Sequence, residues 1–134
     1  MEKAKILVVD DEVDICNTTK NFLTRRGYEV YTALTKDEAM DIIKQNKPNI
    51  ILLDIRLKEA SGIDILKEAK QIDKNVKVVM VTALDDEENM KQAKAWGADD
   101  YIAKPFTAAY LNDVLIQKLK TMAFREKKER EGQQ

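Results

Sequence analysis

Short apolar runs alternate along this chain with longer segments whose apolar residues recur at helical spacing. Three of the runs are continuously apolar, which is typical of central strands covered on both faces. The run at 29–33 alternates between polar and apolar residues, as an edge strand does. The pattern therefore predicts an α/β fold with a parallel sheet. The expected strands are residues 5–9, 29–33, 50–53, 76–81 and 101–103.

Five helices are expected between and after these strands. They cover about 13–26, a segment opened by the capping box Thr35–Glu38, a segment beginning near Ser61, about 86–96, and a long segment from Thr107. Each helix is predicted to turn one apolar face toward the core. In chain order, the residues of these faces are Ile15, Cys16, Thr19, Phe22 and Leu23 in the first helix; Ala39, Ile42 and Ile43 in the second; Ile65, Leu66, Ala69 and Ile72 in the third; Met90, Ala93 and Trp96 in the fourth; and Leu111, Leu115, Leu119 and Met122 in the fifth.

The chain is predicted to hold one domain. Residues 1–124 form that domain, and residues 125–134 are a charged tail or the start of a linker. The 134 residues are 44% hydrophobic with a net charge of −1, so no bulk attraction to nucleic acid or acidic membranes is implied. A single cysteine and the lack of a long apolar stretch favour a cytoplasmic protein. The absence of histidine excludes His–Ser catalysis and His-ligated zinc.

Polar residues stand where four of the apolar runs end. Asp10 and Asp11 follow the first run, Asp54 the third, Thr82 the fourth and Lys104 the fifth. Open α/β sheets build their sites at the carboxyl ends of their strands. Three carboxylates, a hydroxyl and an ammonium at one edge indicate a divalent cation and a phosphoryl group.

Each of these residues has a plain structural explanation when taken alone. Asp10 and Asp11 fit a helix N-cap with a first-turn acid, and Asp54 fits a turn at a strand end. Three converging carboxylates repel one another, however. Mg²⁺ would remove that conflict, because it prefers oxygen ligands and accepts carboxylates, water and phosphate oxygens together.

The set as a whole resembles the response-regulator receiver domains of two-component signalling, and among them the small single-domain chemotaxis type. The resemblance covers residues 4 to about 120. The matching segments are Ile-Leu-Val-Val-Asp-Asp-Glu at 6–12, Leu-Leu-Asp-Ile-Arg-Leu at 52–57, Ser-Gly-Ile-Asp at 61–64, Val-Val-Met-Val-Thr-Ala at 78–83 and Gly-Ala-Asp-Asp-Tyr-Ile-Ala-Lys-Pro-Phe at 97–106.

The resemblance implies a five-stranded, doubly wound, flavodoxin-like fold with strand order 2-1-3-4-5. It implies that Asp54 is the phosphoacceptor. Asp11, Asp54 and the backbone carbonyl of Arg56 would bind Mg²⁺ directly, and Asp10 would hold the ion through water.

The resemblance also implies that residues of the fourth and fifth strands bind the phosphoryl group and respond to it. Thr82 would donate its hydroxyl to the phosphoryl oxygens, Lys104 would pair with them, and the small Ala83 would leave room beside them. The Lys104–Pro105 peptide bond would be cis. Tyr101 matches the aromatic switch position.

Three positions modify this picture. Lys58 stands where the family usually has proline, which suggests a looser loop and a second cation near the phosphate. Arg56 and Leu84 occupy positions that tune the phosphoryl lifetime in the family.

The implied function is a phosphorylatable switch rather than a conventional enzyme, although the domain would promote its own phosphorylation and dephosphorylation. A histidine kinase or phosphotransfer protein would supply the phosphoryl group. The readout would be a surface of the fourth helix, fifth strand and fifth helix. Val114 either forms an exposed patch there with Met90 and Tyr101 or is a partly covered flank of the core. That surface would meet an effector, a fused output domain or a second copy of the chain, and no nucleic acid or membrane directly.

Three other classes compete with this interpretation. A Mg²⁺-dependent aspartyl-phosphate phosphatase would carry a second aspartate two residues after its nucleophile, where this chain has Arg56. An interaction module that had lost the chemistry would not need Asp10, Asp11, Asp54, Thr82 and Lys104 together. A flavin-binding protein would need a phosphate loop after the first strand, where three acidic residues stand instead.

Overall fold

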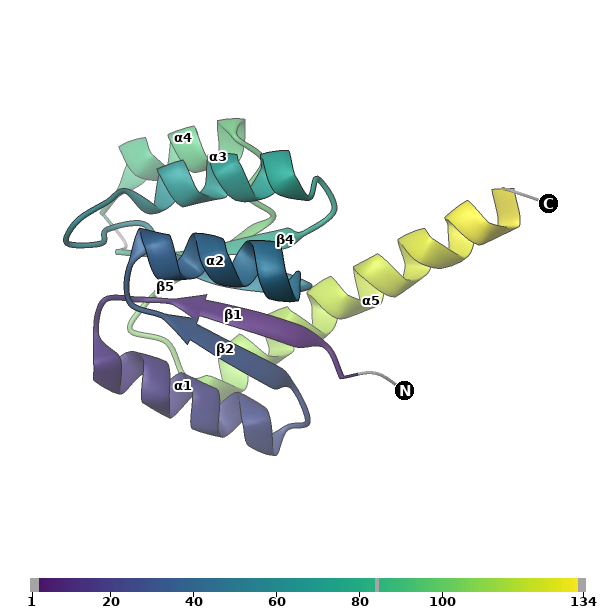
Figure 1. Cartoon of the computed structure of the whole chain (residues 1–134), viewed down its shortest axis with the longest axis horizontal. Coiled ribbons are helices and arrows are strands. Elements are labelled where there is room, and N and C mark those ends of the chain that lie inside the picture. The colour runs from purple at the N-terminus through teal and green to yellow at the C-terminus, as the bar shows by residue number, and fades with distance from the viewer. Residues whose placement is uncertain (1–2, 84, 133–134) are drawn as a thin grey trace.

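A computed structural model describes residues 3–83 and 85–132 of the chain, with side chains described as far as Met122 (Figure 1). The prediction made for Leu84 falls outside the described residues. So do the side chains of the charged run at 125–131.

Five parallel strands form one sheet with the order β2-β1-β3-β4-β5. This confirms the predicted fold class, a flavodoxin-like doubly wound sheet. The strands are β1 (Lys5–Val9), β2 (Glu29–Ala33), β3 (Ile50–Asp54), β4 (Lys77–Ala83) and β5 (Asp100–Lys104).

Three strands run further toward their carboxyl ends than predicted. Asp54 is still within β3, where it pairs with Val81, and Ala83 of β4 pairs with Lys104 of β5. The hydrogen-bonded ladder thus includes Asp54, Thr82 and Lys104, three of the polar residues that end the apolar runs, whereas Asp10 and Asp11 follow β1. The backbones of the first three are held by neighbouring strands, which fixes where their side chains begin.

Helices cover both faces of the sheet. They are α1 (Val13–Arg25), α2 (Lys36–Asn46), α3 (Gly62–Ile72), α4 (Glu87–Ala95) and α5 (Ala108–Gly132). Helices α1 and α5 pack on one face, and α2, α3 and α4 pack on the other (Figure 1). The two layers bury alternate residues of the central strands, such as Leu7 in one and Val8 in the other.

The capping box predicted for α2 is present with one difference. The Thr35 hydroxyl accepts the Glu38 N–H at 3.2 Å. The Glu38 carboxylate reaches back to the N–H of Leu34, at 3.1 Å, rather than to that of Thr35. Both bonds satisfy donors at the helix start.

Two residues predicted to face the core are exposed instead. Ile72 ends α3 and is 42% exposed, and Trp96 is the C-cap of α4 and is 49% exposed. Helical spacing predicts an inner face for both, but Ile72 is the last residue of α3 and Trp96 follows the last residue of α4. The Lys67 ammonium lies 4.4 Å from the centroid of the Trp96 ring, so this aromatic face has a cation as its partner.

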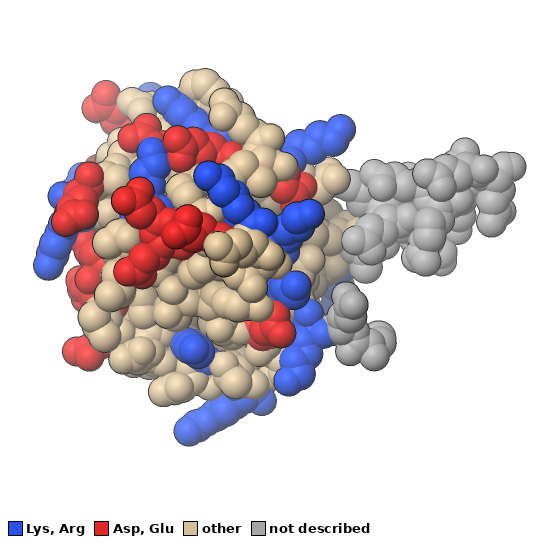
Figure 2. Space-filling view, viewed as in Figure 1, with Lys and Arg blue, Asp and Glu red and all other residues tan. Residues whose placement is uncertain are grey.

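Helix α5 continues without a break past residue 124 and projects beyond the sheet (Figure 1). Within the described residues, no helix combines the length and apolar character needed to cross a membrane. Acidic and basic side chains are interspersed on the face shown in Figure 2.

Candidate functional site

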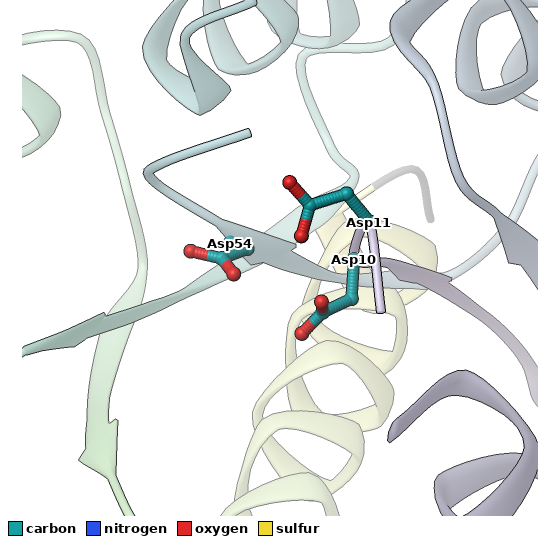
Figure 3. Close-up of side chains that lie close together, drawn as sticks. All are labelled: Asp10, Asp11 and Asp54. Carbon is teal, nitrogen blue, oxygen red and sulfur yellow. The ribbon is translucent and has the colours of Figure 1, made fainter. Parts of the chain in front are cut away.

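The three predicted carboxylates come together at the carboxyl ends of two neighbouring strands. Val9 of β1 pairs with Leu53 of β3, so the residues that follow them emerge side by side. One carboxylate oxygen each from Asp10, Asp11 and Asp54 lies within 4.8 Å of the others. Figure 3 shows Asp10 and Asp11 at the end of β1 and Asp54 at the end of β3.

The Lys104 ammonium joins this group from the end of β5. Its Nζ lies 2.8 Å from Asp54 Oδ2 and 3.1 Å from Asp10 Oδ2. Asp10 is 4% exposed and Asp54 is 8% exposed. A buried carboxylate needs a compensating charge, and Lys104 supplies it to two of the three.

The pKa values reflect burial and pairing together. Burial raises the pKa of Asp54, and the hydrogen bond and charge of Lys104 oppose that rise without cancelling it. For Lys104, burial alone would lower the pKa, but Asp54 and Asp10 outweigh burial and raise it. Lys104 is therefore an ammonium at neutral pH, and Asp54 is a more basic carboxylate than one in water.

Backbone amides of the loop after β3 hold two of the carboxylates. The Arg56 N–H donates to Asp54 Oδ1 at 3.0 Å, and the Lys58 N–H donates to Asp11 Oδ2 at 2.9 Å. Proline has no N–H and could not make the second bond. Lysine in place of the family's usual proline was expected to loosen this loop. In the structure, the Lys58 N–H instead attaches the loop to Asp11.

Thr82 and Ala83 lie beside the carboxylates at the end of β4. The Thr82 hydroxyl is buried and donates to the carbonyl oxygen of Ala83 at 3.2 Å. Both residues line a cleft of about 430 Å³. The other lining residues are Asp11, Glu12, Asp54, Ile55, Arg56, Lys58, Asp86 and Lys104.

Gly62 lets α3 begin directly against the strand that carries Asp54. Its N–H donates to the Ile55 carbonyl at 2.8 Å. A Cβ at this position would overlap the backbone carbonyl oxygen of Asp54 and lie 2.9 Å from the Ile55 Cα. The position of Asp54 therefore depends on a residue with no side chain at the start of α3.

A second polar group borders the cleft, and its roles were not predicted. Asp86 Oδ2 lies 3.1 Å from the Nε of Arg56, and both Asp86 oxygens lie 3.0 Å from the Nδ2 of Asn89. The hydrogen bonds from Asn89 and Arg56 hold the pKa of Asp86 below its usual value. The sequence placed Asp86 at a helix start, but no pattern indicates that its partner stands thirty residues earlier.

Tyr101 is partly buried, and its hydroxyl is buried without a hydrogen-bond partner among the described residues. Met90 is also partly buried. Val114 is 7% exposed and packs in the α1–α5 layer, whereas Tyr101 packs in the opposite layer. The prediction that Val114 forms an exposed patch with Met90 and Tyr101 is therefore wrong, because Val114 completes the core face of α5.

The Lys104–Pro105 peptide bond is cis, as predicted.

Cys16 is buried, as predicted, and lies beneath the site. Its thiol donates to the Asp10 carbonyl at 3.4 Å, and burial is the main cause that raises its pKa to about 11.

Because the thiolate is the nucleophile, we expect native Cys16 to react with a thiol reagent at pH 8 more than about a hundredfold slower than in the urea-unfolded chain. A chromogenic disulfide reagent measures both rates. Equal rates would contradict the described burial.

Comparison with known proteins gives a consistent result. The family model described as "Response regulator receiver domain" matches residues 6–116. The sporulation initiation phosphotransferase F of Bacillus subtilis is 33% identical over 115 residues, which cover 86% of this chain and 93% of that protein. The alkaline phosphatase synthesis transcriptional regulatory protein PhoP of the same species is 39% identical, but the chain spans only 45% of its length.

Solved structures agree in fold. A CheY-like receiver domain protein from Methanospirillum hungatei has a TM-score of 0.89 and 33% identity, with 92% of this chain and 99% of that chain covered. The Vibrio cholerae chemotaxis protein CheY4 has a TM-score of 0.82 and 28% identity, with 87% and 98% covered.

Proposed function

This chain belongs to the response regulator receiver domain family, and we propose that it accepts a phosphoryl group from a partner's phosphohistidine onto Asp54. Receiver domains are typically not conventional enzymes, and this one carries the acidic metal site of a two-component response regulator. Asp54 is the phosphoacceptor in this function, Mg²⁺ is the cofactor, and a changed helix surface is the output.

One observation carries the proposal. Three carboxylates and one ammonium, from the ends of three strands, meet around a single point. Asp54 accepts hydrogen bonds from Lys104 and the Arg56 N–H, and Asp10 accepts from Lys104 and the Glu12 N–H, so both carboxylates are fixed in place around the cleft. The Asp54 carboxylate is thus oriented at the end of β3, where one of its oxygens can act as the nucleophile.

The donor set fits Mg²⁺. All side-chain donors of the cluster are oxygens, and the single Lys104 ammonium is shared by Asp10 and Asp54 while Asp11 forms no ion pair among the described residues, so the three carboxylates keep two uncompensated negative charges that a divalent cation would balance. Asp11, Asp54 and the backbone carbonyl of Arg56 would hold the ion, with Asp10 joined through water. Bound Mg²⁺ would neutralise charge on the phosphoryl oxygens.

The transfer needs positioning more than covalent chemistry. An oxygen of Asp54 attacks the phosphorus, the new P–O bond forms as the P–N bond to the donor imidazole breaks, and the imidazole nitrogen keeps the electron pair. Lys104 and the Thr82 hydroxyl bind the phosphoryl oxygens, and Ala83 leaves space beside them. Dephosphorylation by water within the same cleft would reset the domain.

The phosphoryl group would act on the rest of the domain through Thr82. Movement of its hydroxyl toward the phosphoryl group would favour the inward position of Tyr101, and α4, β5 and α5 would then present a changed surface that includes Met90. An effector, a fused output domain or a second copy of the chain would read this surface. We place the domain at residues 1–124, followed by a tail or linker, in a cytoplasmic protein.

The proposed function is tested by incubating the protein with acetyl phosphate. We expect its intact mass to rise by one phosphoryl group with Mg²⁺ and to stay unchanged with EDTA. Equal labelling in the two conditions would contradict the metal's role. The positive control is a receiver domain that acetyl phosphate labels under the same conditions. If the control is labelled and this protein is labelled in neither condition, the proposed function is contradicted.

Mg²⁺ should also stabilise the folded protein, because it binds the native carboxylates. At ten times its dissociation constant, Mg²⁺ adds about 1.4 kcal/mol, which is roughly 3 to 6 °C in the melting temperature. Asp11→Ala should remove this response and, by relieving repulsion, melt no lower than the wild type without metal. Thermal melts with and without MgCl₂ measure both effects. An unchanged wild-type melting temperature would exclude a magnesium site here.

A further inference from the structure

Arg56 joins the phosphoacceptor strand to the start of α4. Its backbone N–H binds Asp54, and its guanidinium Nε binds Asp86, the N-cap of α4, at 3.1 Å. One residue therefore touches both the reacting carboxylate and a helix whose first turn is far away in sequence. Both Arg56 and Asp86 line the cleft that holds Asp54.

The two partners differ in their freedom to move. The Arg56 side chain is 69% exposed, whereas the Asp86 side chain is 7% exposed. Asp86 is also held by the Asn89 amide through both of its oxygens, and its carboxylate makes no hydrogen bond that caps the helix. When Arg56 leaves this pair, Asp86 keeps the hydrogen bonds from Asn89 but loses its cation, so the exchange also weakens what holds the start of α4.

Helix α4 has few other attachments. Ala93 is its only buried residue. A helix held by so little buried surface responds to the loss of one polar tie at its first turn.

We propose that the Arg56–Asp86 ion pair is a latch that phosphorylation of Asp54 opens, with the Arg56 guanidinium exchanging Asp86 for the phosphoryl oxygens. This proposal rests on the proposed function and adds a regulatory contact to the same site. A phosphoryl group carries nearly two negative charges and three acceptor oxygens, so it competes well with one carboxylate for a guanidinium. When Arg56 changes partner, the loop after β3 is released from α4.

The test uses beryllofluoride with Mg²⁺ as a phosphoryl mimic on the full chain. The two sides of the latch predict effects of opposite sign. Arg56→Ala removes a group that binds the mimic, so affinity should fall by at least about threefold. Asp86→Asn weakens the competitor for Arg56, so affinity should rise by about two- to fivefold, the size expected for a partly exposed ion pair. Titration followed by amide signals in a ¹⁵N spectrum gives the affinities.

The same spectra report on α4. In Asp86→Asn without the mimic, amide signals of residues 87–90 should already be displaced toward their mimic-bound positions in the wild type. Glu68→Gln breaks the exposed Lys36–Glu68 ion pair, which lies outside the cleft, and should behave as the wild type does.

Two results would overturn the latch. If Arg56→Ala and Asp86→Asn change the affinity in the same direction, or leave it unchanged, their pair is structural only, while mimic binding to the wild type still supports the proposed function. If the wild type does not bind the mimic, the proposed function and the latch fail together.

Discussion

Asp54→Asn is expected to abolish phosphorylation, lowering the rate of labelling by acetyl phosphate at least about a hundredfold. The amide nitrogen and oxygen that replace the carboxylate are poor nucleophiles, and the change also removes one charge from the proposed magnesium site. Intact mass measured over a time course in Mg²⁺ gives the rate. The fold should persist, because Asp10 keeps its ion pair with Lys104.

The matched control for this variant is Asp41→Asn. Asp41 is exposed on α2, so the same chemical change there should leave labelling at the wild-type rate. Undiminished labelling of Asp54→Asn would show that another residue accepts the phosphoryl group.

Gly62→Ala is expected to destabilise the protein by more than about 3 kcal/mol. The added methyl group would overlap the Asp54 carbonyl oxygen, and neither β3 nor the start of α3 can withdraw without breaking backbone hydrogen bonds. Urea unfolding followed by circular dichroism measures the loss. The folded fraction of Gly62→Ala should also be phosphorylated by acetyl phosphate more slowly than the wild type, because the added methyl group displaces the backbone of Asp54.

Ser61→Ala provides the comparison. It removes the N-cap hydrogen bond that the Ile63 N–H donates to Ser61 Oγ and should cost about 1 kcal/mol. A Gly62→Ala variant no less stable than Ser61→Ala would mean that α3 does not approach β3 as described.

The sheet could be predicted from the sequence because local pattern determines it. Continuous apolar runs identify the central strands, and the polar residues that end the runs lie together wherever the strands are parallel. That arrangement puts Asp10, Asp11, Asp54 and Lys104 at one edge of the sheet, and the strand order implied by the family resemblance makes the ends of β1 and β3 neighbours. The strand ends were placed too early, because apolar character stops at the site while the ladder continues.

Helical spacing was less informative at helix ends. The helical repeat predicts that Ile72 and Trp96 lie on an inner face. Both are exposed, because they stand where α3 and α4 end. An exposed position for Val114 is consistent with the sequence, because Leu111, Leu115 and Leu119 alone form an apolar stripe on α5. The structure buries Val114, since α5 packs against both α1 and the sheet and needs a wider apolar face.

Contacts that depend on loops and helix starts could not be predicted from the sequence. One such contact is the ion pair between Arg56 and Asp86. Another is the close packing of Gly62 against the Asp54 backbone, which leaves no room for a Cβ and depends on how the loop leads into α3. Neither has a spacing signal, because each depends on the path of a loop in three dimensions.

The central claim is that Asp54 receives the phosphoryl group from a phosphohistidine. It is tested most directly by incubating the wild-type chain with a phosphorylated histidine donor and Mg²⁺, trapping the product by borohydride reduction, and locating the modified residue by peptide mass spectrometry. The account predicts a single modified residue, Asp54, with the label lost under mild base before reduction. Modification at Asp10, at Asp11 or at a serine or threonine would contradict it.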